Sequence, residues 1–511
     1  MRFSARSTAA AISVALCAAT LSGCSGSAGN RATDRTTLDI ATLSAAQSLD
    51  PAEAAGGTVM YFQPVYDTLV ERAPDGTYKP MLATRWSYDR ARTALSLTLR
   101  KGVKFSDRTP FDGEAVRKNL DHFKSGGGAN AKTLSTLDKV TVESPTRVTL
   151  HLSAPDPAML FYLSDSAGLM ASPAALKGSS LETTPVGTGP YTLDKKKTSL
   201  GVKYVYARKA DYWGDQLPYK TVTISRFDNE TAIVNGLRTR QIDFSVLQEA
   251  DQQIAVETDP ELSGTKVTPN FQGLLLFDRA GLRTPALKNR KVRQALNHAL
   301  DRRTMLEQIR RGRGESTAQV FGPETKGYDR DLDTRYPHEP ATARKLMKEA
   351  GYAKGFTLKL PKVAAIVGDN LASSIQSDFK AIGVKVVWDT LDGATAVRKI
   401  SKDRAYPAMV MNMNQTSTDW LTVQDLVAPG AYNLFGTTDT TIKKLVPRIQ
   451  RGGDGAAQAA RELNRHLVEE AWFVPFYRME WQQVAHRTVK AAPQSGMGYP
   501  SLYNYRPVEG N

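Results

Sequence analysis

The side chains that most often perform chemistry in enzymes and metal sites are sparse in this sequence and lie far apart. The six histidines show no spacing that suits a shared metal ion, and the HExxH, GxSxG and P-loop patterns are absent. A glycine-punctuated stretch at residues 184–191 (TPVGTGPY) lacks the Lys-Ser/Thr that a phosphate-binding loop requires. We therefore expect a binding protein with no catalytic residue, metal site or cofactor. An exported hydrolase is the less favoured alternative.

The two cysteines, Cys17 and Cys24, both lie near the N-terminus. An apolar, alanine-rich run at residues 8–21 is too short to be a permanent membrane span, and it leads into Leu21-Ser22-Gly23-Cys24. This order looks like a bacterial lipoprotein signal, in which cleavage before the cysteine leaves its thiol for a diacylglyceryl group. A general secretory signal with an incidental cysteine is the alternative.

Cleavage there would make residues 1–23 a signal peptide and leave Cys24 as the single thiol, so no internal disulfide is expected. The following residues 24–37 are rich in Ser, Gly and Ala and predict a flexible tether. Two acyl chains on Cys24 would hold the protein stably at a membrane, since each buried CH₂ contributes roughly 0.8 kcal/mol.

The chain is basic, with a formal net charge of +15 at pH 7. Its basic residues are dispersed, and the densest run, residues 310–313 (RRGR), has no interleaved aromatic residues. For an exported lipoprotein this charge favours attraction to an anionic membrane, and we expect no nucleic-acid partner.

Periodicity predicts an α/β protein. Alternating leucines at residues 95–99 indicate a half-buried strand, and Asp112 is placed to cap a helix that follows. A long helix is predicted at residues 289–310, and a strand–helix–strand unit at residues 356–388. Two α/β lobes are expected, with the chain crossing between them near residues 248–271 and again near residues 480–490.

A series of short segments spread over nearly the whole mature chain then resembles one family, the extracytoplasmic solute-binding proteins of peptide/nickel-type ABC importers (solute-binding protein family 5). Each segment alone is a weak signal, but their number and order are highly specific. The segments are 81–86 (MLATRW), 97–105 (LTLRKGVKF), 107–116 (DRTPFDGEAV), 187–191 (GTGPY), 211–214 (DYWG), 292–296 (VRQAL), 299–302 (ALDR), 343–352 (ARKLMKEAGY) and 474–477 (VPFY).

The resemblance implies a two-lobed, periplasmic-binding-protein-like fold of type II, with an enlarged first lobe and two crossing hinge strands. On this basis the first lobe with its extra subdomain is expected at residues 38–270 and the second lobe at residues 271–484. Residues 485–511 are expected to return to the first lobe. The ligand of this family lies between the lobes.

Ligand selection is expected from residues 409–425 (MVMNMNQTSTDWLTVQD). In peptide-binding members an aspartate of this segment pairs with the peptide's α-amino group. Here Met413 and Asn414 stand where the family has an aromatic residue, and Gln415 to Ser417 stand where that acid should be. Asp419 and Trp420 match the later part of the pattern. Either Asp419 takes over the amino group or the ligand has none; a helix N-cap and a core aromatic are the structural alternatives.

Five residues besides Asp419 and Trp420 complete the predicted ligand set. Asn412 and Asn414 are predicted to contact the ligand because amides beside a buried strand need partners, and Met413 lies between them. Gln47 and Asp50 lie where the family's N-terminal strand opens onto the cleft. Asp50 can also be a turn residue before Pro51.

The resemblance implies a lipid-anchored, monomeric receptor on the extracytoplasmic face of the membrane. It would capture an oligopeptide or peptide-like solute and deliver it to an ABC permease and its ATPase subunits. A non-peptide ligand, such as a metal chelate, an opine or a saccharide, is the alternative.

Overall fold

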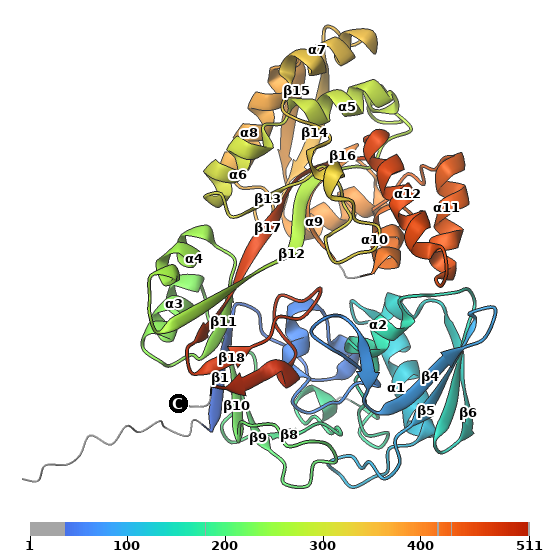
Figure 1. Ribbon diagram of the computed structural model, residues 1–511, viewed down its shortest axis with the longest axis vertical. Helices are drawn as coiled ribbons and strands as arrows, with labels where there is room; N and C mark the ends of the chain where they lie inside the picture. The colour runs from blue at the N-terminus through green and yellow to red at the C-terminus, as the bar shows by residue number, and fades with distance from the viewer. Residues whose placement is uncertain (1–35, 179, 416–417, 431, 509–511) are drawn as a thin grey trace, which may run out of the picture. The chain divides into compact units, whose positions relative to one another are not determined.

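Two long strands, β12 (Leu262–Leu276) and β17 (Phe473–His486), pair with each other in antiparallel fashion over most of their length (Figure 1). The structure is a computed structural model that describes residues 36–508 except 179, 416, 417 and 431. The predicted signal peptide, Cys24 and most of the predicted tether therefore lie outside the described residues. No helix in the described ranges is long and apolar enough to cross a membrane.

Both long strands belong to a nine-stranded mixed sheet with the order β16-β12-β17-β11-β1-β10-β9-β8, and β13 adds to β17. The C-terminal half of β12 pairs with β16, whereas the C-terminal half of β17 pairs with β11. The two strands thus connect two parts of the sheet, and they overlap both predicted crossings. The other strands are β1 (Thr37–Thr42), β8 (Tyr191–Leu193), β9 (Lys203–Arg208), β10 (Thr221–Arg226), β11 (Phe244–Leu247), β13 (Gly314–Ser316) and β16 (Ala408–Asn414).

The apolar stretch at the end of β12 is buried on both faces. Leu274 and Leu276 pack into one hydrophobic cluster, whereas Phe271 and Leu275 pack into another. Side chains alternate between the faces of a strand, so a strand covered on both sides needs an unbroken apolar run.

The helices are α1 (Gly113–Ser125), α2 (Met159–Leu163), α3 (Glu230–Arg238), α4 (Ala250–Glu257), α5 (Arg290–Ala299), α6 (Arg302–Arg310), α7 (Pro340–Glu349), α8 (Asp369–Lys380), α9 (Gly393–Val397), α10 (Asp419–Leu426), α11 (Thr440–Arg451) and α12 (Ala456–Glu469).

A separate four-stranded antiparallel sheet, in the order β4-β5-β7-β6, packs against α1 in the N-terminal half of the chain. The predicted strand is β5, whose Leu95, Leu97 and Leu99 are at most 2% exposed. Asp112 is the N-cap of α1, as predicted, and accepts a hydrogen bond from Ala115 N at 2.9 Å. These strands are β4 (Ala83–Tyr88), β5 (Ala94–Leu99), β6 (Leu137–Ser144) and β7 (Arg147–Leu152).

The prediction of one long helix at residues 289–310 is wrong. The segment forms α5 and α6, which are separated at Leu300 and Asp301. The Asp301 carboxylate caps α6 by accepting from Thr304 N at 3.0 Å, so a second helix begins at this point. The predicted strand–helix–strand unit is confirmed, because β14 and β15 are parallel and α8 lies between them in the chain.

The smaller strand pairs are β2 (Val70–Arg72) with β3 (Tyr78–Pro80), β14 (Phe356–Lys362) with β15 (Val384–Thr390), and β18 (Val489–Ala491) with β19 (Tyr505–Pro507).

The buried carboxylate of Asp67 accepts hydrogen bonds from the segment at residues 211–214 (DYWG). Asp67 is fully buried and accepts hydrogen bonds from Tyr212 Oη at 3.0 Å, Trp213 Nε1 at 2.7 Å and Tyr503 Oη at 2.6 Å. Burial raises the pKa of Asp67, although these donors oppose the rise. The segment therefore joins distant parts of the chain around one acceptor, which is a structural role.

Asp50 and His122 form an ion pair between the 3-10 turn at Pro51–Glu53 and α1. Asp50 caps the turn through Ala52 N at 2.9 Å, and His122 Nε2 lies 2.8 Å from Asp50 Oδ1. Burial works against the charged Asp50, but its hydrogen bonds with His122 and Ala52 outweigh burial and lower its pKa. The hydrogen bond to Asp50 raises the pKa of His122.

We predict a pH-dependent contribution of this pair to stability. The raised pKa of His122 stabilises the folded state fully below about pH 6.5, and this stabilisation is lost as the pH rises through the folded-state value. The lowered pKa of Asp50 stabilises above about pH 4 and is lost at lower pH. The difference in unfolding free energy between wild type and His122→Gln, measured by urea denaturation, should therefore be largest between these limits.

The matched control is His151→Gln, because within residues 36–508, as far as they are described, His151 hydrogen-bonds the Thr141 hydroxyl and no carboxylate. Its difference from wild type should not peak in that pH range. A His122→Gln difference that is constant from pH 4 to pH 9 would contradict the ion pair.

Candidate functional site

A cavity of about 320 Å³ lies beside the long strand pair. Its size is at the lower end of the usual range for small-molecule sites. Segments that are distant in sequence form its walls: residues 266–269 of β12, residues 322–324, Gln415, Pro74 and residues 493–497.

The β12 wall is an interruption of the strand pairing. The register with β17 shifts between Val267 and Asn270, and Pro269 has no N–H to offer the ladder. The carbonyl of Pro269 instead accepts a hydrogen bond from Gln415 N at 2.7 Å. The bulge thereby leaves backbone of β12 on the cavity wall and attaches the end of β16 to it.

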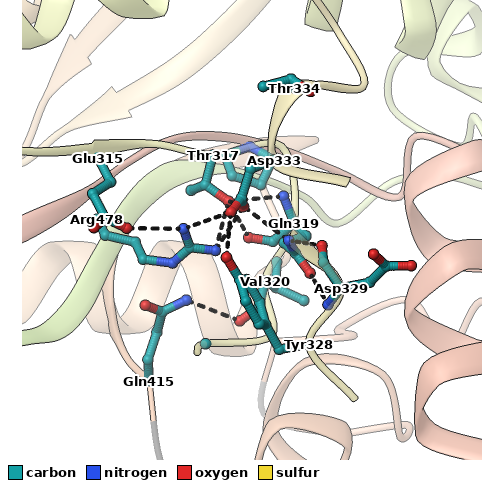
Figure 2. A network of polar contacts seen from close by, with 12 residues as sticks. Glu315, Thr317, Gln319, Val320, Tyr328, Asp329, Asp333, Thr334, Gln415 and Arg478 are labelled. Atoms are coloured by element: carbon teal, nitrogen blue, oxygen red, sulfur yellow. Dashed lines mark hydrogen bonds and ion pairs between the residues drawn. The ribbon is translucent and has the colours of Figure 1, made fainter. Parts of the chain in front are cut away.

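Residues 322–324 of the loop at residues 317–329 form another part of the wall. A buried ion pair holds this loop in place (Figure 2). Arg478 of β17 is 0% exposed and donates two hydrogen bonds to Asp333, at 2.7 and 3.1 Å. The same carboxylate accepts from Thr317 Oγ1 at 2.7 Å, Gln319 Nε2 at 2.8 Å and Tyr328 Oη at 2.7 Å. Both ends of the loop are therefore bonded to one side chain.

The electrostatics of this network agree with its geometry. Burial alone would raise the pKa of Asp333, but its hydrogen bonds and charge interaction with Arg478 outweigh that effect and lower it. Burial and the hydrogen bond to Asp333 raise the pKa of Tyr328 to about 12. Asp333 therefore stays ionised and Tyr328 stays a hydrogen-bond donor at neutral pH.

Asp419 bonds to the same loop near its C-terminal end. Its Oδ1 accepts from Gly327 N at 2.7 Å, and burial raises the pKa of Asp419 against the effect of this bond. The N-cap of α10 is Thr418, and Asp419 is the first residue of the helix. Asp419 is therefore not the helix N-cap that the sequence offered as its structural alternative. The Asn464 amide donates to Gly327 O at 2.9 Å.

Gln415 is the buried polar side chain on the cavity wall. It is 5% exposed, and its amide group donates a long hydrogen bond of 3.4 Å to Val320 O (Figure 2). Within the described part of the chain its Oε1 has no hydrogen-bond partner. Gly322 allows the loop to approach this side chain, since a Cβ at that position would lie 2.8 Å from Gln415 Cβ.

The C-terminal segment at residues 493–497 completes the cavity. Ser495 N donates to Pro74 O at 3.0 Å, and Gln494 Nε2 donates to Arg72 O at 2.9 Å. Ser495 Oγ then donates to Glu324 Oε2 at 2.6 Å. This last bond joins the C-terminal segment to the loop held by Arg478.

The structure places the predicted residues of the 409–425 segment apart from this cavity. Met413 and Trp420 are 8% and 6% exposed and belong to a hydrophobic cluster, which matches the structural alternative for Trp420. Asn412 and Asn414 are exposed, and Asn412 Oδ1 accepts from Gln272 Nε2 at 2.7 Å. Asp419 contacts the cavity only indirectly, through the loop.

The two predicted first-lobe residues also lie elsewhere. Gln47 is exposed, and Asp50 is occupied by Ala52 and His122. None of the seven predicted ligand residues, all of which are described, lines the cavity. Their roles in binding stay predictions.

Sequence reasoning missed Lys266 and Glu324, which are the charged residues among those lining the cavity. Single charges in polar stretches carry no signal that distinguishes them from solvated surface charges. The sequence did give a signal at Gln415, because this residue falls where the family pattern expects an acid.

The cavity is suited to binding. It combines one cation, one anion, backbone of β12 and an amide oxygen that has no hydrogen-bond partner among the described residues. The described residues hold no group of three or more His, Cys, Asp or Glu side chains that could bind a metal ion.

Comparisons with known proteins identify the fold. The periplasmic binding protein DppA from Helicobacter pylori, solved with the peptide STSA, superimposes with a TM-score of 0.77 over 93% of this chain and 99% of that chain, at 18% identity. This likeness confirms the predicted two-lobed, periplasmic-binding-protein-like α/β fold.

Two relatives resemble the chain in sequence. Heme-binding protein A of Haemophilus influenzae is 26% identical over 491 residues, which cover 86% of each chain. Glutathione-binding protein GsiB of Salmonella paratyphi A is 30% identical over 307 residues, which cover 58% of this chain and 57% of the relative.

The model of the bacterial extracellular solute-binding proteins, family 5 (middle region), matches residues 77–430, which is more than half of the chain. Proteins of this family are extracytoplasmic transport proteins and not enzymes, which confirms the prediction of a binding protein. The chain therefore belongs to the bacterial extracellular solute-binding proteins of family 5, which supply solutes to ABC importers.

Proposed function

We propose that this protein captures an oligopeptide or peptide-like solute between its two lobes and delivers it to an ABC permease and its ATPase subunits. The observation that carries the proposal is the cavity beside β12 and β17, because its walls offer a cation, an anion and an amide acceptor. A peptide presents the complementary groups. The relative named for glutathione, a tripeptide, supports the same ligand class.

We propose lobe boundaries that fall inside the two long strands. The first lobe then comprises residues 38–270, the second residues 271–484, and residues 485–511 return to the first. Hinge closure of two lobes around a ligand is well established for periplasmic binding proteins. The ligand drives closure only if it binds the closed form more tightly, and contacts from both lobes to one cavity would provide that difference.

A metal chelate is the second candidate ligand, because the relative that matches 86% of this chain is named for heme. An opine or a saccharide is a further possibility from the sequence alone. These ligands lack the combination of a free ammonium group and peptide N–H groups, so a binding panel separates them from peptides.

We predict that peptides stabilise the purified protein against heat. A ligand at 100 times its Kd adds about 2.7 kcal/mol to the free energy of unfolding of a protein that binds it only when folded. The measurement is the shift in Tm with a panel of di-, tri- and tetrapeptides, with heme, a nickel chelate and disaccharides run in parallel. Stabilisation by one of the non-peptide ligands and by no peptide would contradict the peptide proposal.

We also propose that the mature protein is a monomer that is anchored to the outer face of the membrane through Cys24. The support is the sequence Leu21-Ser22-Gly23-Cys24 and the polar stretch that follows it. A flexible tether would let the folded part reach both solute and permease.

The anchor predicts that Cys24→Ser releases the protein from membranes. In a bacterial host that processes lipoproteins, the variant should move from the membrane fraction to the soluble fraction, because it lacks the acyl chains that each contribute roughly 0.8 kcal/mol per buried CH₂. Cys17→Ser is the matched control and should stay with the membrane, since Cys17 lies in the predicted signal peptide. Membrane retention of Cys24→Ser would disprove the anchor.

A further inference from the structure

Two side chains of opposite charge lie on the cavity wall and keep capacity for another partner. Lys266 Nζ lies 3.3 Å from Glu480 Oε2, and its side chain is 61% exposed. An ammonium group has three donors, so Glu480 leaves donors free. Glu324 accepts one hydrogen bond from Ser495 Oγ, at 2.6 Å, and a carboxylate can accept about four.

The third group is the buried amide of Gln415. A side chain that is 5% exposed and has an oxygen without a partner in the described residues is uncommon, because such an oxygen loses its bonds to water without replacement. The residue lines the cavity, so a ligand bound there can supply the N–H donor that this oxygen lacks.

We propose that Glu324, Lys266 and Gln415 make this cavity selective for a zwitterion that carries peptide N–H groups, with Glu324 binding its ammonium group and Lys266 its carboxylate. Gln415 accepts from a peptide N–H between the two ends. The inference rests on the proposed peptide-binding function, and it assigns the residues that bind the two ends of the ligand.

The same three groups disfavour the other ligand classes. A neutral saccharide has no charged group to pair with Glu324 or Lys266, so it gains nothing from these two charges. A ligand with two carboxylates would meet one cation, Lys266, and would place its second carboxylate near Glu324. Discrimination therefore comes from repulsion as well as from attraction.

The test uses the peptide that binds wild type most tightly in the panel, together with its N-acetylated and C-amidated forms. Isothermal titration should show that Glu324→Gln weakens binding of the free peptide by about twofold to fivefold, since Glu324 is exposed and ion pairs of exposed groups are screened by water. The same variant should bind the N-acetylated peptide as well as wild type does. Lys266→Gln should show the corresponding pattern with the C-amidated peptide, and Gln415→Leu should weaken all three forms alike.

These substitutions are chosen to preserve the fold. Glutamine at position 324 can still accept from Ser495, and after Lys266→Gln the Glu480 carboxylate keeps Arg313 at 3.1 Å. Glu307→Gln and Lys443→Gln are matched controls, because both residues are exposed and outside the cavity. Both controls should bind every peptide form like wild type.

The outcomes separate the inference from the function on which it rests. If wild type binds peptides but Glu324→Gln and Lys266→Gln bind the free peptide equally well, the residue assignment is wrong and the peptide function stands. If wild type binds no peptide, both are wrong.

Discussion

The antiparallel pairing of β12 with β17 is the constraint on which the rest of the structure depends. These are the strands that connect the part of the sheet around β16 with the part around β11. Backbone hydrogen bonds along this antiparallel ladder fix the separation of the two strands. The break in this pairing at Pro269 puts part of β12 on the cavity wall, so a ligand bound there would contact one of the two long strands.

The second constraint is the charge of Arg478, which lies within β17 and is fully buried. A buried guanidinium is costly unless it is paired and hydrogen-bonded, and Asp333 meets that need. Because Thr317 and Tyr328 bond to the same carboxylate, the pair also fixes the loop that carries Glu324. The ion pair that compensates the buried charge of Arg478 thereby also positions Glu324 on the cavity wall.

Much of the fold could be predicted from local patterns. The strand at residues 95–99 and the Asp112 cap were predicted correctly, because alternation and capping depend on neighbouring residues. The helix at residues 289–310 was predicted as one because its apolar spacing continues through Asp301. The break lies at Leu300 and Asp301, and the next residue, the buried Arg302, donates to the carbonyls of Pro475 and Tyr336 far along the chain. Such partners are invisible to a local pattern.

The sequence by itself determined the family and the class of function, because short segments from residue 81 to residue 477 match the family in the same order. The cavity was decided only by the tertiary structure. Lys266, Glu324 and Gln415 are separated by long stretches of chain and meet because a strand bulge, a loop held by Arg478 and the end of β16 converge. Local sequence preferences act over a few residues, whereas the position of a charge opposite another depends on how whole elements pack.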